Sequence, residues 1–473
     1  DLWCIDMPEN VDIIIKNSII ATMDPQERLF EDGMVAIKDG IIVDVDKTSR
    51  IEDKYTADKV IDGKGKIILP GFINTHDHLF QVLMKSLGDD LAILDWWPTA
   101  VGPYVQYLEK EHSYYSALLG SVELIKSGVT TILDFQYANP NPGTDVAILE
   151  AWKKLGVRGI LGRGYSDYDM WNLNLGRLIE PPEKIFSEVE NLIRNWHKKE
   201  NGRLNVWVAP GAPFTISDET AMKTREFADK YKIGITIHLH ESKREVEQWK
   251  QQFGTSPLQY YYEKLPEFLG PDMLGVHCVW MDEKDIKIMK EKDIKVSHNT
   301  ISNMYLASGV APVPEFLKNG IVVSLGVDGA ASNNSQDFME LIKATALLHK
   351  VARVDPQAIT AKQVLRMATI DGARAVLMEN EIGSIEKGKK ADIIIFDLNN
   401  IQMRPVNNPL SQVVYCGKSW NVETVIVDGN IIMENRVVKG VDEQELIWKV
   451  QELADDLVEK AGKTELRKQL WYR

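Results

Sequence analysis

The chain has 473 residues with a formal net charge of −14, and 44% of them are hydrophobic, a composition typical of a folded protein with a large core. The acidic charge disfavours nucleic acid and anionic membrane surfaces as partners, because both are bound by basic surfaces. No apolar stretch approaches the ~20 residues of a membrane span, no signal-peptide pattern begins the sequence, and three scattered cysteines form neither a disulfide framework nor a CxxC zinc site. We therefore expect a cytoplasmic protein that binds neither membranes nor nucleic acid.

Both ends of the chain are rich in β-branched residues. From residue 11 to 45 the sequence reads as short strands, and Asp39-Gly40 is a strong signal for a two-residue hairpin turn. From Gly71 onward, short apolar strands alternate with helical stretches over roughly 300 residues, which indicates a parallel sheet, and eight such strands can be counted. After about residue 380 the β character returns, with a second turn signal at Asp428-Gly429.

Eight parallel strands with intervening helices close a (β/α)8 barrel. The sequence therefore predicts an α/β protein: a (β/α)8 TIM barrel over residues 69–378, with a small β-sandwich domain built from residues 1–68 and 379–473. Within the last segment, apolar residues at spacings of four, three and four predict an amphipathic helix over 443–460. We expect this helix to pack on its own domain, and a dimerisation helix is the alternative.

Polar residues at the carboxyl ends of the predicted barrel strands are the strongest functional signal, because these ends line the active-site mouth of such barrels. The residues are His76 and His78 on strand one, His238, His240 and Glu241 on strand five, His277 on strand six, His298 on strand seven and Asp328 on strand eight. One such histidine alone is more often a packed, hydrogen-bonded residue, but six of the nine histidines share this placement. Neutral imidazoles with a carboxylate are the ligands of a catalytic Zn²⁺ or a similar divalent ion.

Strand geometry narrows the ligand set. Residues two apart on an extended chain point to the same side, so His76 and His78 can reach one ion while Asp77 points away from it. The same alternation places His238 and His240 on one face of strand five, so geometry does not choose between them.

The ion and the neighbouring acids suggest a chemistry. A bound divalent ion lowers the pKa of water and makes a nucleophile available at neutral pH. Attack on a heteroaromatic carbon also needs a separate acid that protonates the ring nitrogen without binding the ion. Glu241, just beyond His238, fits that role, and a surface acid at a helix N-terminus is the alternative. Asp328 is expected to bind the ion and to take the proton from its water, because an unpartnered buried carboxylate would be costly.

The motifs resemble those of one family over nearly the whole chain. They include LPGFINTHDHLFQ, DDLAILDWW, IHLHES, HCVWMDEKDI, SHNTISNMYLASGVAPVPEFL and LGVDGAASNN. The sequence is similar to the amidohydrolase superfamily, specifically the branch that contains the S-adenosylhomocysteine/methylthioadenosine deaminases and the atrazine chlorohydrolase and melamine deaminase group. The resemblance implies a homo-oligomer that acts on a small heteroaromatic molecule.

The same resemblance implies a metal site and roles for its residues. One ion, Zn²⁺ first and Fe²⁺ as the alternative, would be bound by His76, His78, His238 and Asp328. Glu241 would carry a proton to the ring, and His277 would polarise the water and orient the substrate. The two-metal members of the superfamily use a carbamylated lysine on strand four, and the corresponding segment LNVWVAPG has no lysine, which favours a single ion.

The sequence evidence for substrate-binding residues is weaker than the evidence for the metal ligands. The candidates are Asp95, Trp96, Trp97, Arg163, Gly211, His298 and Tyr305. By resemblance, Asp95 with Trp96 or Trp97 could bind ribose hydroxyls and stack on a ring, and core aromatics that cap a helix are the alternative. Arg163 matches a substrate-binding arginine of the adenosine-type deaminases.

Three positions depart from those deaminases: their strand-four histidine is Gly211 here, and the Pro and Lys of their HNPxSNxKL motif are Thr300 and Tyr305. The departures favour the triazine branch, whereas Glu241 and the segment DGAASNN favour amine removal. We therefore predict an enzyme, a metal-dependent aminohydrolase that releases ammonia from an amino-substituted N-heteroaromatic ring of an adenosine-type substrate, guanine, a pterin or an aminotriazine. The alternatives are displacement of chloride or another leaving group from an s-triazine, cyclic amide hydrolysis at a two-metal site, and a non-catalytic scaffold.

Overall fold

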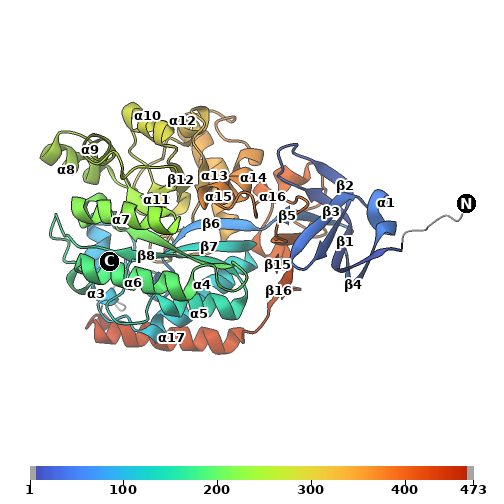
Figure 1. The fold of residues 1–473 in the computed structure, drawn as a ribbon, viewed down its shortest axis with the longest axis horizontal. Coiled ribbons are helices and arrows are strands. Elements are labelled where there is room, and N and C mark those ends of the chain that lie inside the picture. The colour runs from blue at the N-terminus through green and yellow to red at the C-terminus, as the bar shows by residue number, and fades with distance from the viewer. Residues whose placement is uncertain (1–6, 466–473) are drawn as a thin grey trace, which may run out of the picture.

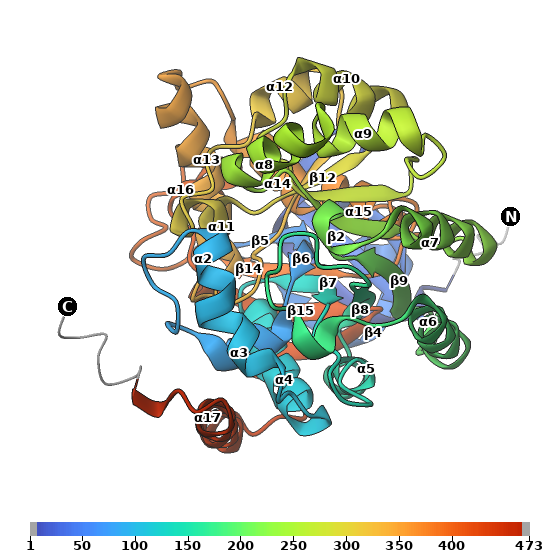
Figure 2. The same cartoon turned by 90° about the vertical axis from the view of Figure 1, so that its left-hand side faces the viewer.

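The computed structural model of the protein describes residues 7–465. Eight parallel strands form a closed barrel in which each strand pairs with the next in the sequence and the last pairs with the first. They are β6 (Phe72–Asp77), β7 (Val129–Gln136), β8 (Arg158–Tyr165), β9 (Leu204–Pro210), β10 (Ile235–Leu239), β11 (Met273–His277), β12 (Lys295–His298) and β13 (Val323–Leu325). Figures 1 and 2 show helices arranged around these strands, and the predicted (β/α)8 barrel is confirmed.

Helices follow the barrel strands and cover their outer side. The longer ones are α4 (Lys110–Lys126), α5 (Val146–Leu155), α6 (Pro182–Trp196), α7 (Asp218–Tyr231), α8 (Lys243–Phe253), α9 (Pro257–Lys264), α10 (Glu283–Lys292), α13 (Phe338–Arg353) and α14 (Ala361–Ala368). Ser217, Ser242 and Asp282 each accept a hydrogen bond from a backbone N–H of the first helical turn, which explains where α7, α8 and α10 begin.

Short helices occupy the loops. Those between barrel elements are η2 (Leu79–Met84), α2 (Ile93–Trp96), η3 (Trp97–Val101), α3 (Gly102–Val105), η4 (Gly176–Leu178), η5 (Pro213–Thr215), α11 (Thr300–Tyr305), α12 (Val313–Lys318) and α15 (Ile370–Ala375). Those near the chain ends are α1 (Thr48–Ile51), η1 (Glu52–Lys54), α16 (Pro409–Tyr415) and η6 (Ser419–Asn421).

Strands from both ends of the chain form a second sheet beside the barrel (Figure 1). They are β1 (Glu9–Ala21), β2 (Leu29–Lys38), β3 (Ile41–Lys47), β4 (Tyr55–Asp62), β5 (Lys66–Pro70), β14 (Ile393–Asp397), β15 (Val422–Val427), β16 (Asn430–Glu434) and β17 (Val437–Val438). Their order is β17-β16-β15-β14-β5-β1-β2-β3, with β4 paired to β1. Ile13 and Ile37 from the first end share a buried cluster with Ile393 and Ile426 from the last, so the two ends build one small core.

Both predicted hairpin turns are present. Asp39 and Gly40, with φ of 50° and 79°, join β2 to β3, and Asp428 and Gly429, with φ of 50° and 74°, join β15 to β16. Two consecutive residues with positive φ match the twist of the flanking strands. A Cβ atom at Gly429 would lie 2.6 Å from the Cα atom of Gly40, so the two turns touch and glycine is needed there.

The C-terminal helix α17 (Glu443–Lys460) spans the residues predicted for it. It packs beside α4, where Nε2 of His112 lies 3.0 Å from Oδ2 of Asp456. The four evenly spaced apolar residues that predicted the helix are buried: Leu446, Val450, Leu453 and Leu457. The helix therefore packs within the chain, but against α4 and η2 of the barrel and not against the small domain to which the sequence assigned it.

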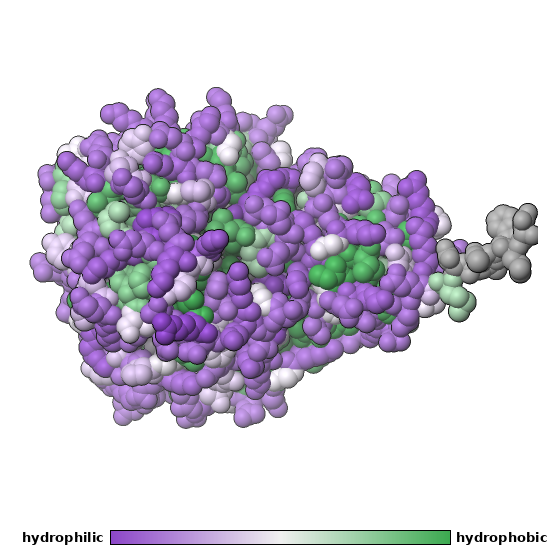
Figure 3. Space-filling model, in the orientation of Figure 1, coloured by the Kyte–Doolittle hydropathy of each residue, from purple (hydrophilic) through white to green (hydrophobic). Residues whose placement is uncertain are grey.

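The face of the molecule in Figure 3 is mostly hydrophilic, with separate apolar patches. Isolated apolar patches of this kind are normal on protein surfaces. Within residues 7–465, no helix combines the length and the apolar character that a membrane crossing requires.

Candidate active site

The carboxyl ends of β6 and β13 meet where the barrel closes. β13 pairs with β6 through Leu325 and Asn74, and the backbone N–H of Asp328 donates to the carbonyl of His76 at 3.1 Å. This contact places the carboxylate beside two imidazoles: Asp328 Oδ1 lies 3.2 Å from His76 Nε2 and 3.4 Å from His78 Nε2. The ligand atoms of these three residues all lie within 4.8 Å of one another, close enough to share one ion.

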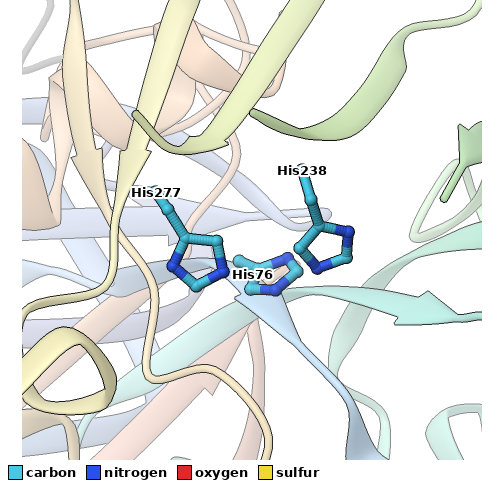
Figure 4. Close-up of side chains that lie close together, drawn as sticks. All are labelled: His76, His238 and His277. Carbon is cyan, nitrogen blue, oxygen red and sulfur yellow. The ribbon is translucent and has the colours of Figure 1, made fainter. Parts of the chain in front are cut away.

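His238, on β10, adds a third imidazole. Its Nε2 atom lies 3.3 Å from Nε2 of His78, and its ring centroid lies 5.0 Å from that of His76. With His277 from β11, His76 and His238 form a second group whose nitrogen atoms lie within 4.8 Å of one another, and Figure 4 shows these three rings close together. Four imidazoles and one carboxylate therefore surround one small volume.

The hydrogen bonds of the imidazoles determine which nitrogen is free. Nδ1 of His78 donates to the carbonyl of Phe135 at 2.7 Å, and Nδ1 of His238 donates to the carbonyl of Gly211 at 2.8 Å. A carbonyl oxygen only accepts, so Nε2 of each neutral ring carries a lone pair, and these lone pairs face each other. Both ring nitrogens of His76 are buried without a hydrogen-bond partner. Such an arrangement is unfavourable for the protein alone, and it fits a divalent cation bound between the nitrogens.

The same three imidazoles are neutral at pH 7. Burial lowers the pKa of His76 to about 4 and the pKa values of His78 and His238 to about 3, because an imidazolium is costly to remove from water. Neutral imidazole is the form that binds metal ions. The donor set is therefore ready for a metal at neutral pH.

Two carboxyl groups of the site have pKa values shifted in opposite directions. Burial, and then the charge of Asp328, raises the pKa of Glu241 well above its ordinary value, which favours the protonated form of this acid. Burial also acts on Asp328, but its close contact with His76, at 3.2 Å, and the neighbouring imidazoles hold its pKa well below the ordinary value. Nε2 of His277 lies 3.5 Å from Glu241 Oε2 and 3.8 Å from Asp328 Oδ2. Two acids beside one histidine whose pKa values are shifted apart are suited to deliver and accept protons in a single reaction.

His240, the other candidate on strand five, lies away from this cluster. It follows the last residue of β10 and has a φ of 51°, so strand alternation no longer sets the direction of its side chain. Its Nδ1 donates to the carbonyl of Trp280 at 3.1 Å, and its Nε2 accepts from the N–H of Leu258 at 3.2 Å. Both nitrogens are used within the fold, so the structure brings His238 and not His240 to the other ligands.

Two residues of α11 support the site and were missed in the sequence. The hydroxyl of Ser302 donates to Oδ2 of Asp328 at 2.6 Å, and Oδ1 of Asn303 accepts from Nδ1 of His277 at 2.9 Å. Both follow the strand-seven histidine closely in the segment SHNTISN, and this position was a usable signal. The carbonyl of Phe135, which orients His78, had none, because a backbone group leaves no mark in the sequence.

A cavity of about 900 Å³, including solvent at its mouth, opens above the cluster. Three predicted substrate-binding residues line it: Trp96, Trp97 and Gly211. The polar end holds His78, His238, Glu241, Glu245, His277 and Asp328. The rest of the wall is largely apolar, with Ile93, Leu94, Phe135, Leu173, Leu175, Leu178, Phe214 and Leu306. The cavity therefore suits a flat apolar ring whose reacting atoms meet the polar end.

Asp95 and Tyr305, two further predicted substrate-binding residues, lie outside the cavity lining. The carboxylate of Asp95 is on a side chain that is 65% exposed, and it lies 3.6 Å from the guanidinium of Arg244. The hydroxyl of Tyr305 donates to Asp89, in the loop that precedes α2. Both residues tie together loops at the barrel rim.

Arg163 and His298 also lie outside the cavity lining. Arg163 is fully buried, and its guanidinium donates to Glu180 at 2.8 Å and to Glu188 on α6. Because α6 covers the outside of the barrel, this side chain points away from the mouth. Nε2 of His298 lies 3.0 Å from Nε2 of His349 on α13, again on the helical side. The structure therefore gives both residues partners within the fold.

Comparison with known proteins finds relatives whose sequences match nearly the whole chain. A family model described as the amidohydrolase family matches residues 67–432. The 5'-deoxyadenosine deaminase of Methanosarcina acetivorans is 38% identical over 451 residues, which cover 95% of this chain and 99% of the relative. The 5-methylthioadenosine/S-adenosylhomocysteine deaminase of Desulforamulus reducens is 36% identical over 448 residues, with 95% and 99% covered.

Solved structures share the architecture. An adenosine deaminase of Xanthomonas campestris with bound zinc has a TM-score of 0.87 at 26% identity, covering 95% of this chain and 99% of that one. The atrazine chlorohydrolase of Arthrobacter aurescens, complexed with zinc, has a TM-score of 0.82 at 23% identity, covering 93% and 100%. At 23% identity, the similarity to the atrazine chlorohydrolase shows a shared fold only.

Proposed function

This chain belongs to the amidohydrolase family and is a hydrolase that acts on C–N bonds. We propose that it removes the amino group of an adenosine-type nucleoside as ammonia. The observation that carries the proposal is the pair of acids beside His277: Glu241 and Asp328 lie 3.5 Å and 3.8 Å from the same nitrogen, and their pKa values are shifted in opposite directions, up for Glu241 and down for Asp328. Hydrolytic deamination needs one group that takes a proton from water and another that gives a proton to the ring. These two residues fill those roles.

We propose one Zn²⁺ ion per chain, held by His76, His78, His238 and Asp328. The free Nε2 lone pairs and the unpartnered nitrogens of His76 support this ligand set. None of the described residues that line the cavity is a lysine, so a carbamylated bridging ligand is not offered there. When bound, the ion supplies water of lowered pKa as the nucleophile at neutral pH.

The protein's own groups then account for each proton. Asp328 accepts a proton from the attacking water, and its hydrogen bond from Ser302 holds the accepting oxygen in place. Glu241 gives its proton to the ring nitrogen next to the carbon under attack, and His277 orients the oxygen that arrives there. The amino nitrogen leaves with its two hydrogens and the proton first taken by Asp328. The second proton of the water returns to Glu241 as the new C–O bond becomes a carbonyl, so one water is consumed for each ammonia released and both acids are restored.

The choice of an adenosine-type ring is supported by the relatives and by the cavity wall. Both curated relatives at 36–38% identity carry names of adenosine-type deaminases. Trp97, Phe135 and Phe214 line the cavity and offer faces on which a purine can stack. We also propose a homo-oligomer in the cytoplasm, which gel filtration and cell fractionation would test.

Ammonia release from a panel of rings tests the proposal. Zn²⁺-loaded enzyme should deaminate 5'-deoxyadenosine and adenosine faster than guanine, a pterin or an aminotriazine. Glu241→Gln should retain its metal and lose ~10²-fold or more in kcat, because an amide cannot deliver the proton. Glu247→Gln is the matched control, since Glu247 lies on α8 with a side chain that is 58% exposed. Hydrolysis of a chlorotriazine without deamination of any purine would instead favour leaving-group displacement, and absence of both metal and activity would favour a scaffold.

A further inference from the structure

His240 and Trp280 join two loops behind the active site, and the proposed mechanism uses neither residue. His240 follows β10, and Trp280 lies in the loop after β11. Nδ1 of His240 donates to the carbonyl of Trp280 at 3.1 Å, and the carbonyl of His240 accepts from the backbone N–H groups of Val279 and Trp280 at 3.1 Å and 3.0 Å. Three hydrogen bonds of one fully buried residue therefore hold the loop after β11.

The backbone at the start of this loop needs such support. His277 and Cys278 have φ of 71° and 49°, although neither is glycine. Residues with a side chain keep this left-handed conformation only where their surroundings hold it. The N–H of Cys278 donates to the carbonyl of Leu239 at 3.0 Å, and His240 holds the next two residues of the loop. The direction in which the ring of His277 leaves the chain therefore depends on the end of β10.

Trp280 extends these contacts to the loop after β12. Its Nε1–H donates to the carbonyl of Ser308 at 2.6 Å, and the N–H of Ser308 donates to the carbonyl of Asn303 at 2.9 Å. Oδ1 of Asn303 in turn accepts from Nδ1 of His277 at 2.9 Å. A chain of hydrogen bonds thus runs from His240 through Trp280 to the imidazole of His277, whose backbone the same two residues hold.

The ring held in this way lies between the two acids of the proposed mechanism. Nε2 of His277 is 3.5 Å from Glu241 Oε2 and 3.8 Å from Asp328 Oδ2, and Glu241 directly follows His240 in the chain. One hydrogen-bonded unit therefore sets the distance between His277 and Glu241 from both sides. Neither His240 nor Trp280 is among the residues that line the cavity, so any effect on the reaction passes through other side chains.

We propose that His240 and Trp280 are positioning residues, which hold His277 so that its Nε2 atom stays between Glu241 and Asp328. The proposal rests on the proposed function and adds two residues to it. A displacement of about 1 Å caused by a change away from the reacting atoms can lower a rate by ~100-fold. Loss of either residue should therefore lower kcat, while KM and metal content stay close to the parent's.

Steady-state ammonia release from 5'-deoxyadenosine by Zn²⁺-loaded enzyme tests this role. We expect kcat to fall ~10-fold or more in His240→Leu and ~3-fold or more in Trp280→Phe, with KM within ~3-fold of the parent's. Trp280→Phe removes only the N–H donor from a ring that is 39% exposed, so it guards against failure of the buried variant to fold. His240→Asn keeps a donor near Nδ1 and should restore kcat to within ~3-fold of the parent's.

The matched control is His197→Leu. Nδ1 of His197 accepts from the N–H of Val206 at 3.1 Å, in the first half of β9, so this variant also removes a hydrogen bond between a histidine and the backbone. We expect its kcat to equal the parent's. A parent-like kcat in both His240→Leu and Trp280→Phe, or an equal fall in His197→Leu, would overturn the positioning role while the proposed function stands.

A double-mutant cycle with His277→Ala separates positioning from a general loss of structure. With no imidazole left to position, His240→Leu should lower kcat by less than ~2-fold in the His277→Ala background. The full ~10-fold effect in that background would overturn the proposal, because the substitution would then act without His277.

Hydrogen exchange of the segment 277–281, followed by mass spectrometry, gives a measurement that does not depend on activity. Exchange should be faster in His240→Leu and Trp280→Phe than in the parent and in His197→Leu, because the backbone N–H groups of this loop lose their support. Parent-like exchange in both variants would overturn the proposal. Absence of ammonia release by the parent from every ring would instead overturn the proposed function and, with it, this role in deamination.

Discussion

Replacing Ser302 with alanine removes the hydroxyl that holds the carboxylate of Asp328. The hydroxyl donates to Oδ2 at 2.6 Å, whereas Oδ1 faces His76 and His78 at 3.2 Å and 3.4 Å. In the proposed mechanism Oδ2 accepts the proton and Oδ1 binds the ion, so the hydrogen bond keeps the two roles on separate oxygens. A hydrogen bond to a charged group contributes about 1.5–3 kcal/mol. If this stabilisation acts in the transition state, where Asp328 must accept a proton in a fixed orientation, and not in the bound ground state, its loss should lower kcat about 10-fold to 100-fold.

The assay combines ammonia release with metal analysis. For Ser302→Ala we expect a lower kcat, a KM close to the parent's and unchanged metal content, because Oδ1 keeps its contacts. Thr300→Val is the matched control: it removes a hydroxyl of the same helix that lies 2.7 Å from Oγ1 of Thr345 and touches no residue of the cluster. Loss of metal in Ser302→Ala, or an equal loss of kcat in Thr300→Val, would refute a positioning role for this hydroxyl.

Three more predictions follow from named contacts. His238→Asn should strip the metal and His240→Asn should retain it, and metal analysis showing the reverse would overturn the ligand assignment. Arg158 is fully buried and donates to Asp392 at 2.7 Å and 2.9 Å, so Asp392→Asn leaves its guanidinium without a charge partner. Urea unfolding should show a free energy of unfolding lower by about 3–5 kcal/mol, and a decrease under about 1 kcal/mol would contradict this. Burial, and then Arg353, lowers the pKa of His349 from 6.5 to about 4, so its contribution to stability is present above pH 6.5 and is lost as pH falls toward 4. His349→Gln should therefore show a smaller decrease in urea midpoint between pH 7 and pH 5 than the parent, and an equal decrease would argue against the shift.

The barrel and the cluster of histidines with Asp328 could be predicted because their signals are local. Each strand is a short run of apolar residues, and the carboxyl ends of parallel strands must meet at one mouth, so a histidine at such an end has a foreseeable neighbourhood. His76 and Asp328 are 252 positions apart (328 − 76), yet both were predicted to lie at the same mouth of the barrel because each ends a strand. The Asp-Gly turns were foreseeable for a similar reason, since few other pairs adopt two positive φ values easily.

The substrate-binding residues could not be placed in this way. Arg163 lies on β8, where every residue is buried, so the sequence carries no alternation that tells the barrel side from the helical side. Alternation placed His238 and His240 together, but the strand ends at Leu239 and the backbone turns there. Asp95 sits in a loop helix, whose orientation depends on contacts with distant segments such as Arg244 on α8.

The source of the oxygen and the fate of the nitrogen test the central claim most directly. Zn²⁺-loaded enzyme should be incubated with 5'-deoxyadenosine in ¹⁸O-labelled water, with ammonia and the mass of the purine product measured in the same sample. We predict one ammonia for each nucleoside consumed and a product that has lost its amino group and carries one labelled oxygen on the ring. An intact nucleoside, or release of free adenine without ammonia, would contradict a deaminase built on Glu241 and Asp328.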